Sequence, residues 1–204
     1  MYHQSVDGLT AFILAGGRSS RMGRDKAFLE LGGRALLDRA LELAGSVTPV
    51  VRIVAPQDRF LTVARTIEDI YPDCGPLGGI HAALTNTSTE LNLVLAVDLP
   101  FVEPDFLEYL IAQASQTAAL VTVPQAAGGF QPLCAVYRKE FAGVAQTALE
   151  RKRNKIDPLF TQVETRVINE AEMHRLNYHP QMFRNLNTPA EFDLAEKACG
   201  KRKS

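Results

Sequence analysis

Glycines and cations are concentrated in the stretch Leu14–Lys26, which reads Leu-Ala-Gly-Gly-Arg-Ser-Ser-Arg-Met-Gly-Arg-Asp-Lys. The stretch follows an apolar segment, Leu9–Leu14, whose composition is typical of a β-strand. Glycines let the backbone approach a ligand closely, and the N–H groups of such a turn attract anions. Arg21 and Lys26 add fixed positive charge to that turn. The combination predicts a site for the phosphates of a nucleoside triphosphate, with a mobile surface turn as the alternative.

The spacing of the stretch excludes two common phosphate-binding loops. A Walker loop requires Gly-Lys-Ser/Thr, but Gly23 is followed by Arg24 and Lys26 by Ala27. The dinucleotide-binding fingerprint requires glycine at two positions that Arg18 and Arg21 occupy here. The stretch therefore represents another kind of phosphate site.

Two aspartates follow segments that are predicted to be strands. Asp98 comes directly after Leu91–Val97, the most apolar segment, which we expect to be a central strand buried on both faces. Open α/β sheets bind ligands at the carboxyl ends of such strands, and Mg²⁺ prefers one or two carboxylates together with phosphates. We therefore expect Asp98 to bind Mg²⁺, although a turn or helix cap would also explain an aspartate there.

Asp69 ends another predicted strand, Thr66–Asp69, and precedes a glycine-rich turn that runs to Ile80. Its carboxylate is suited to accept hydrogen bonds from a base amine or a ribose hydroxyl. Asp73, inside the turn, is a weaker candidate for the same role. A capping or turn role explains both aspartates almost as well.

Apolar segments of strand and helix type alternate through the first half of the chain, which predicts a doubly wound α/β sheet with helices on both faces. The stretch Gly128–Tyr137 suggests a turn and a returning strand, so we expect a mostly parallel, mixed sheet. We expect one domain over residues 1–204, with flexible tails at 1–8 and 200–204. The predicted strands are 9–14, 50–55, 66–69, 91–97, 118–123 and 165–168, and the predicted helices are 35–44, 80–84, 104–114, 141–153 and 190–198. Thr188 and Glu191 are placed to cap the last of these helices.

Composition excludes several classes of protein. The net charge is −1, from 22 basic and 23 acidic residues, so no bulk charge attracts nucleic acid or an anionic membrane. No apolar run approaches the roughly 20 residues of a membrane span.

The N-terminal residues lack the features of a secretion signal, and the three cysteines fit neither a disulfide framework nor a zinc site. The four histidines show no metal-ligand pairing, and we interpret them as structural or surface residues. We expect a cytoplasmic protein without nucleic-acid or membrane partners.

The stretch Leu14–Lys26 resembles the signature loop of the molybdenum cofactor guanylyltransferases, which belong to a wider group of nucleotidyltransferases with a Rossmann-like fold. The resemblance implies an enzyme that transfers GMP from GTP to the phosphate of molybdopterin or Mo-molybdopterin and releases pyrophosphate. Further blocks are similar to the family's in the same order: Gly75-Pro76-Leu77-x-Gly79, Asp98-Leu99-Pro100, Gln131-Pro132-Leu133 and Asn185-Leu186-Asn187-Thr188-Pro189.

The resemblance also implies roles for individual residues. Mg²⁺ would bind at Asp98, and Asn185 and Asn187 would lie toward the pterin acceptor, although a turn before the last helix explains both asparagines without a ligand. We also expect transient contact with other cofactor-biosynthesis proteins or molybdoenzymes. The implied catalytic residues are Arg21, Lys26 and Asp98, and the implied nucleotide-binding residues are Leu14, Ala15, Gly16, Gly17, Lys26, Asp69 and Asp98.

Base specificity is less closely determined than triphosphate binding. Some family members have an asparagine for the nucleotide at the end of the second strand, where this chain has Val54-Ala55-Pro56. A sibling enzyme that uses CTP on molybdopterin, or a nucleotide on a sugar phosphate, is therefore an alternative. Gly16-Gly17 favours the guanine user, because related cytidylyltransferases typically have Ala-Gly there. A nucleotide-binding cofactor chaperone is the non-enzymatic alternative, against which the presence of both Lys26 and Asp98 argues.

The basic run Arg151–Lys155 is a further cationic feature. We interpret it as a solvated helix end. Binding of the anionic pterin or of a partner is the alternative.

Overall fold

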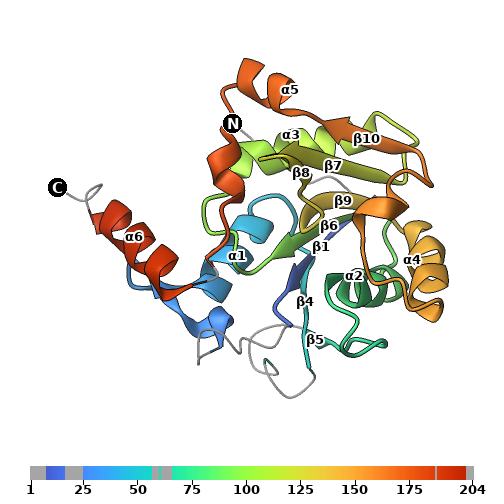
Figure 1. The fold of residues 1–204 in the computed structure, drawn as a ribbon, viewed down its shortest axis with the longest axis horizontal. Helices are drawn as coiled ribbons and strands as arrows, with labels where there is room; N and C mark the ends of the chain where they lie inside the picture. The colour runs from blue at the N-terminus through green and yellow to red at the C-terminus, as the bar shows by residue number, and fades with distance from the viewer. Residues whose placement is uncertain (1–7, 17–24, 57–59, 61–65, 187, 201–204) are drawn as a thin grey trace.

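A sheet of eight strands runs through the molecule, with helices packed against both of its faces (Figure 1). The computed structural model describes residues 8–16, 25–56, 60, 66–186 and 188–200. The strands of the sheet are β1 (Leu9–Leu14), β4 (Val51–Val54), β5 (Thr66–Ile67), β6 (Leu91–Ala96), β7 (Val121–Ala126), β8 (Gly129–Phe130), β9 (Cys134–Arg138) and β10 (Thr165–Ile168). A separate hairpin consists of β2 (Glu30–Leu31) and β3 (Arg34–Ala35).

The helices alternate with these strands through much of the chain. They are α1 (Leu36–Gly45), α2 (Pro76–Thr85), α3 (Pro104–Ser115), α4 (Phe141–Glu150), α5 (Glu170–Arg175) and α6 (Pro189–Gly200), with short 3₁₀ helices η1 (Lys26–Phe28), η2 (Asp157–Leu159) and η3 (Pro180–Phe183). None of the described helices combines the length and the apolar character needed to cross a bilayer.

The strand order is β10-β7-β9-β6-β1-β4-β5, and β8 pairs with β7. Strands β6, β1, β4 and β5 are mutually parallel, and Ile13 of β1 pairs with both Ile53 and Leu95. Strand β9 runs antiparallel to its neighbours β6 and β7, whereas β10 is parallel to β7. The predicted mixed, mostly parallel sheet is therefore confirmed.

Side chains that point alternately to the two faces of the central strands divide the core into two layers. Ala11 and Ile13 of β1 pack with α1 and α3, whereas Phe12 and Leu14 point to the opposite face and pack with α2 and α4. Successive strand side chains point to opposite faces, so a strand that is apolar throughout can bury both sides. Helices cover both faces, as the sequence predicts.

Some boundaries differ from those predicted. The predicted glycine-rich turn is confirmed as far as Gly75, but its last part was predicted wrongly, because α2 begins at Pro76, one helical turn before Ile80. Gly75, at φ 67°, precedes the helix, and proline suits the first helical position because its missing N–H would have no helical partner.

Helix α4 ends at Glu150 rather than Arg153, and Lys152 adopts a positive φ of 58°. The basic run Arg151–Lys155 is exposed beyond the helix end.

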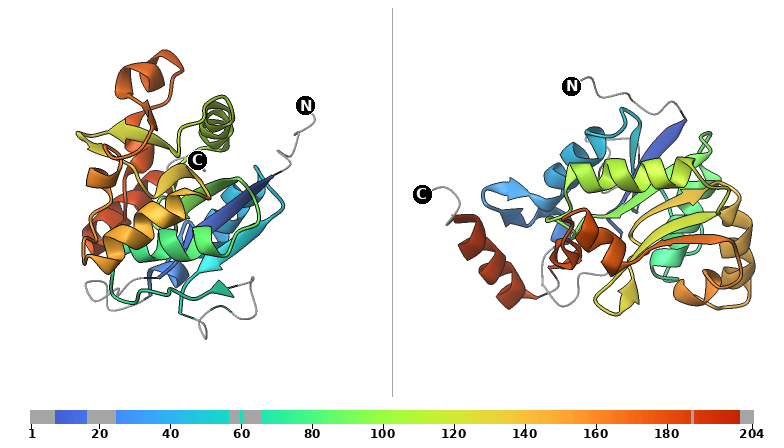
Figure 2. Two further views of the ribbon diagram at one scale, coloured as in Figure 1. Left: turned by 90° about the vertical axis from the view of Figure 1, so that its right-hand side faces the viewer. Right: turned by 90° about the horizontal axis from the view of Figure 1, so that it is seen from above.

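Helix α6 begins with the capping box that the sequence predicts. Thr188 N–H donates to Glu191 Oε2 (2.9 Å), and Glu191 N–H donates to Thr188 Oγ1 (3.2 Å). The helix lies beside the β2–β3 hairpin, away from the sheet (Figures 1 and 2). Glu196 joins the two elements by accepting a hydrogen bond from Gly32 N–H (2.8 Å).

Candidate nucleotide site

The carboxyl ends of three adjacent strands are tied together at one edge of the sheet. Val97 N–H, just beyond β6, donates to the Leu14 carbonyl at the end of β1 (3.2 Å). Ala15 N–H in turn donates to the Val54 carbonyl at the end of β4 (3.1 Å). These bonds bring the beginning of the glycine-rich stretch and the Asp98 segment to the same edge, which is where open α/β sheets bind ligands.

Lys26 and Asp98 form an ion pair at this edge. Lys26 Nζ lies 2.8 Å from Asp98 Oδ2, and the two side chains are only 21% and 17% exposed. Lys26 is held by the 3₁₀ turn η1, which Asp25 caps by accepting a hydrogen bond from Ala27 N–H (3.1 Å). The sequence predicts Lys26 and Asp98 as separate site residues, and in the structure their side chains are in contact.

The segment that contains Asn185 and Leu186 also contacts this edge of the sheet. Leu186 N–H donates to the Asp98 main-chain carbonyl (3.3 Å), and the Leu186 side chain is fully buried. Asn185 therefore lies in a segment that contacts the Asp98 loop directly. Three predicted site residues, Gly17, Arg21 and Asn187, lie outside the described residues, and their roles stay predictions.

Gly16 is a glycine that the described structure does not require. Its φ is not positive, and an added Cβ would make only ordinary contacts, 3.8 Å from the Val54 carbonyl oxygen and 3.9 Å from Ala55 Cα. The protein's own contacts therefore do not explain a glycine here, whereas the close approach of a ligand to the main chain would explain it. Gly16 follows the end of β1 and lies beside the end of β4.

Asp69 lies at the same edge of the sheet but two strands away from Asp98. The intervening strands are β1 and β4, so the ends of β5 and β6 are about 14 Å apart at the usual strand spacing. Asp69 Oδ1 accepts a hydrogen bond from Tyr71 N–H (2.9 Å). Burial raises the pKa of Asp69, and this hydrogen bond opposes that rise. The site thus has two carboxylate ends that no single small anion would span.

Helix α2 fits closely around Asp69. A Cβ on Gly78, in the first turn of the helix, would lie 2.7 Å from Asp69 Oδ2 and 2.9 Å from the Tyr71 carbonyl oxygen. A Cβ on Gly79 would lie 2.5 Å from Leu14 Cδ2. These two glycines let the helix approach β1 and the Asp69 carboxylate.

The weaker candidate, Asp73, is an exposed turn residue at φ 63°. That conformation is common for aspartate in turns and explains its presence.

His81 is a buried histidine of α2 that is 4% exposed, and the sequence predicts only a structural or surface role for it. Burial lowers the pKa of His81, whereas the charges of Asp69 and Glu150 raise it. The i, i+3 spacing from Gly78 places His81 on the helix face that Asp69 approaches. That spacing is a sequence signal, but its meaning depends on knowing that the helix begins at Pro76.

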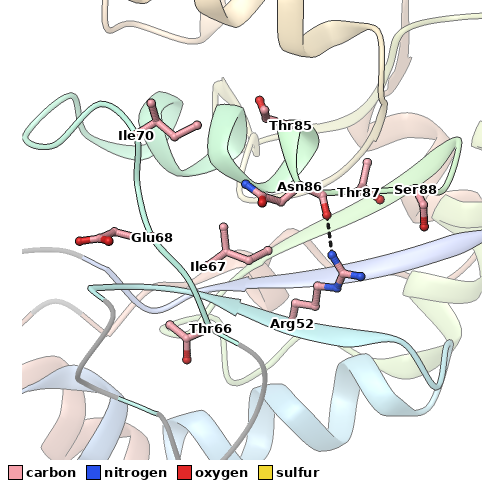
Figure 3. Close-up of a pocket in the computed structure, with 9 residues that line it drawn as sticks. All are labelled: Arg52, Thr66, Ile67, Glu68, Ile70, Thr85, Asn86, Thr87 and Ser88. Atoms are coloured by element: carbon pink, nitrogen blue, oxygen red, sulfur yellow. Dashed lines mark hydrogen bonds between the residues drawn. The ribbon is translucent and has the colours of Figure 1, made fainter.

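An open hollow of about 650 Å³ lies next to the Asp69 segment, between β5 and the end of α2 (Figure 3). Arg52 spans it and donates a hydrogen bond from Nη1 to the Asn86 carbonyl (2.5 Å), while Glu68 and Ile70 line its rim. None of the predicted site residues lines this hollow. The candidate site therefore lies at the converging strand ends and not in the hollow.

The fold and the charged strand ends define a nucleotidyltransferase with a Rossmann-like sheet. The family model described as "MobA-like NTP transferase domain" matches residues 11–165, and the chain belongs to this family. The matched region contains the glycine-rich stretch, Asp69 and Asp98.

Similar proteins align over almost their whole length. A molybdenum cofactor guanylyltransferase of Desulfosudis oleivorans is 33% identical over 95% of this chain and 96% of its own. A probable molybdenum cofactor guanylyltransferase of Carboxydothermus hydrogenoformans is 31% identical over 92% and 95%. The crystal structure of molybdopterin-guanine dinucleotide biosynthesis protein A from Archaeoglobus fulgidus has a TM-score of 0.82 at 26% identity, covering 94% of this chain and 99% of its own.

The buried Asp69 carboxylate leads to a prediction about stability. Because the pKa of Asp69 is raised on folding, the folded chain binds this proton more tightly than the unfolded chain, and the resulting stability is lost as pH rises through the raised pKa. Asp69→Asn keeps an oxygen acceptor for Tyr71 N–H without the charge. We expect this variant to be more stable than the parent at pH 7, with a difference that shrinks toward pH 4, as measured by urea unfolding.

The matched control for this measurement is Asp193→Asn, an exposed aspartate on α6. It should remain within about 0.5 kcal/mol of the parent at both pH values. An Asp69→Asn variant less stable than the parent at pH 7 would contradict the inferred effect of burial.

Proposed function

We propose that the protein transfers GMP from GTP to the phosphate of molybdopterin or Mo-molybdopterin and releases pyrophosphate. The observation that carries the proposal is the Lys26–Asp98 ion pair at the edge of the central strands. The similarity to other proteins also supports the proposal, because the chain aligns along nearly its whole length with proteins named molybdenum cofactor guanylyltransferase. The reaction is an in-line attack of an acceptor phosphate oxygen on the α-phosphorus of GTP.

Two anionic reactants repel each other, so the residues must hold them together and neutralise negative charge. Lys26 is placed to bind phosphate oxygens when it leaves Asp98, and its single mobile charge can follow the reacting phosphates. Arg21 is assigned the second cationic contact from the sequence. The glycine at position 16 would let a nucleotide approach the main-chain groups of residues 14–17 closely.

Asp69 is the proposed acceptor of hydrogen bonds from guanine. Two strands separate it from Asp98, so the base and the triphosphate would occupy opposite ends of the site. Main-chain groups at Val54-Ala55-Pro56 lie at the carboxyl end of β4, one of these two strands. Asn185 lies in the segment that contacts the Asp98 loop, which supports its proposed contact with the acceptor.

The residues present fit Mg²⁺ as a cofactor bound mainly through the substrate. In the described part of the chain, no group of three or more histidine, cysteine, aspartate or glutamate side chains is placed to enclose a metal. Mg²⁺ typically uses one or two carboxylates and completes its shell with phosphates and water. Asp98 is the proposed ligand, and bound Mg²⁺ would neutralise charge on the phosphates. Lys26 already contacts Oδ2 of this carboxylate, so Lys26 and Mg²⁺ would both interact with the Asp98 side chain.

The assay that tests the proposal offers each of the four nucleoside triphosphates with Mg²⁺ and molybdopterin. Pyrophosphate and the dinucleotide product are then quantified. We expect turnover with GTP alone. Turnover with CTP alone would replace the proposal with the cytidylyl transfer considered above, and nucleotide binding without any product would indicate a non-catalytic protein.

Lys26→Ala should lower turnover at least a hundredfold while the chain stays folded, because a preorganised charge at the reacting phosphates contributes at this scale. Steady-state kinetics and circular dichroism are the measurements. Lys139→Ala is the matched control, since Lys139 is exposed and bonds through its main chain to Glu90 at the opposite edge of the sheet. Near-parent turnover in Lys26→Ala would remove Lys26 from the mechanism.

Asp98→Asn should abolish Mg²⁺-dependent activity, because an amide is a poor ligand for a hard cation that prefers anionic oxygen. The measurement is turnover during an Mg²⁺ titration. Asp105→Asn alters an exposed carboxylate at the start of α3 and should keep the parent's response. If Asp98→Asn responded to Mg²⁺ as the parent does, Asp98 would not be the ligand.

A further inference from the structure

His81 is a buried histidine whose polar contacts are incomplete. It lies in α2, and its Nδ1 has no hydrogen-bond partner among the described residues. Its Nε2 lies 3.4 Å from Thr85 Oγ1, and that hydroxyl donates to the His81 carbonyl (2.8 Å). We therefore assign the proton to Nε2 and leave Nδ1 as a bare acceptor. Burying an acceptor without a partner is destabilising, so stability alone does not explain a histidine here.

A chain of contacts leads from His81 to Asp69. The His81 and Tyr71 rings meet edge to face, with centroids 5.1 Å apart and an interplanar angle of 74°. Tyr71 also donates its N–H to Asp69 Oδ1 (2.9 Å). On the other side, the carboxylate lies against Gly78, one helical turn before His81. The carboxylate is thus held between the Tyr71 main chain and one face of α2, and His81 supports both.

The charges of two carboxylates on different elements act on the His81 ring. Asp69 lies in the segment after β5, and Glu150 is the last residue of α4, which packs beside α2. The Tyr71 ring packs against His81 from the Asp69 segment, and Thr85 contacts it from α2 itself. Burial disfavours the imidazolium, and the carboxylates favour it. At neutral pH the ring is uncharged and serves as a packing surface.

We propose that His81 is a positioning residue for Asp69 and, through Asp69, for recognition of the guanine base. This inference rests on the proposed function. The neutral ring holds Tyr71, whose N–H fixes the carboxylate toward the base. Protonation creates an imidazolium that attracts the same carboxylate toward α2, so GTP binding weakens in acid.

The test compares His81→Ala and His81→Phe with the parent, using direct binding of a fluorescent methylanthraniloyl derivative of GTP and steady-state kinetics. At pH 7.5, His81→Ala should raise both Kd and KM for GTP about tenfold and leave kcat within about twofold, because the carboxylate loses its support while the reacting groups are untouched. His81→Phe should keep the parent values, because phenylalanine retains a ring against Tyr71.

The pH dependence separates the ring's shape from its charge. Between pH 7.5 and 5.5 the parent's Kd should rise, and His81→Phe should show a clearly smaller rise, because phenylalanine cannot be protonated. Protonation of the nucleotide affects both proteins equally and cancels in the comparison. His174→Phe, an exposed histidine on α5, is the matched control and should follow the parent's profile.

Several outcomes would overturn the inference. One is a folded His81→Ala variant with the parent's Kd, and another is a loss of kcat and melting temperature without a change in KM. Identical pH profiles for the parent and His81→Phe would remove the role of charge. If Asp69→Asn weakens GTP binding and His81→Ala does not, only this inference fails. If the parent itself does not bind GTP, the proposed function fails with it.

Discussion

The ion pair between Lys26 and Asp98 joins two segments that are far apart in sequence, and the rest of the site is arranged around it. Both side chains are largely shielded from water, so desolvation offsets much of their attraction, and the pair is a weak source of stability. The hydrogen bonds that tie the ends of β4, β1 and β6 hold the two charges in place. The fold therefore positions the pair, and the pair presents a cation and a carboxylate at one edge.

The environment of Asp69 follows the same physical logic. Burial disfavours its charged form, and the neighbouring histidine has a buried nitrogen without a partner in the described structure. Close packing at Gly78 and Gly79 requires residues that lower helix propensity within the first turns of α2. Features that a purely structural helix would avoid thus collect around one carboxylate, as is common where function and stability compete.

The sequence predicts most elements because their local signals agree with their surroundings. Strands β1 and β10 begin and end where the apolar pattern places them, and Thr188 with Glu191 forms the predicted cap. The start of α2 could not be predicted, since glycines usually indicate a turn and only the close approach of Leu14 and Asp69 explains them within a helix. For the site, residue type and order predict Lys26 and Asp98 individually. Their 2.8 Å contact, and the position of His81, depend on burial and three-dimensional packing.

The bond from Leu186 to the Asp98 carbonyl makes the Asp98 loop depend on a segment near the C-terminus. Strands β1, β4 and β6 leave the ribosome first, and their parallel pairing needs no residue beyond Ala96. The Asp98 loop receives its last main-chain partner only when the C-terminal segment has emerged. A chain shortened before Leu186 would lack this bond and the buried Leu186 side chain, so both the Asp98 loop and the core layer that contains Leu186 would lose support.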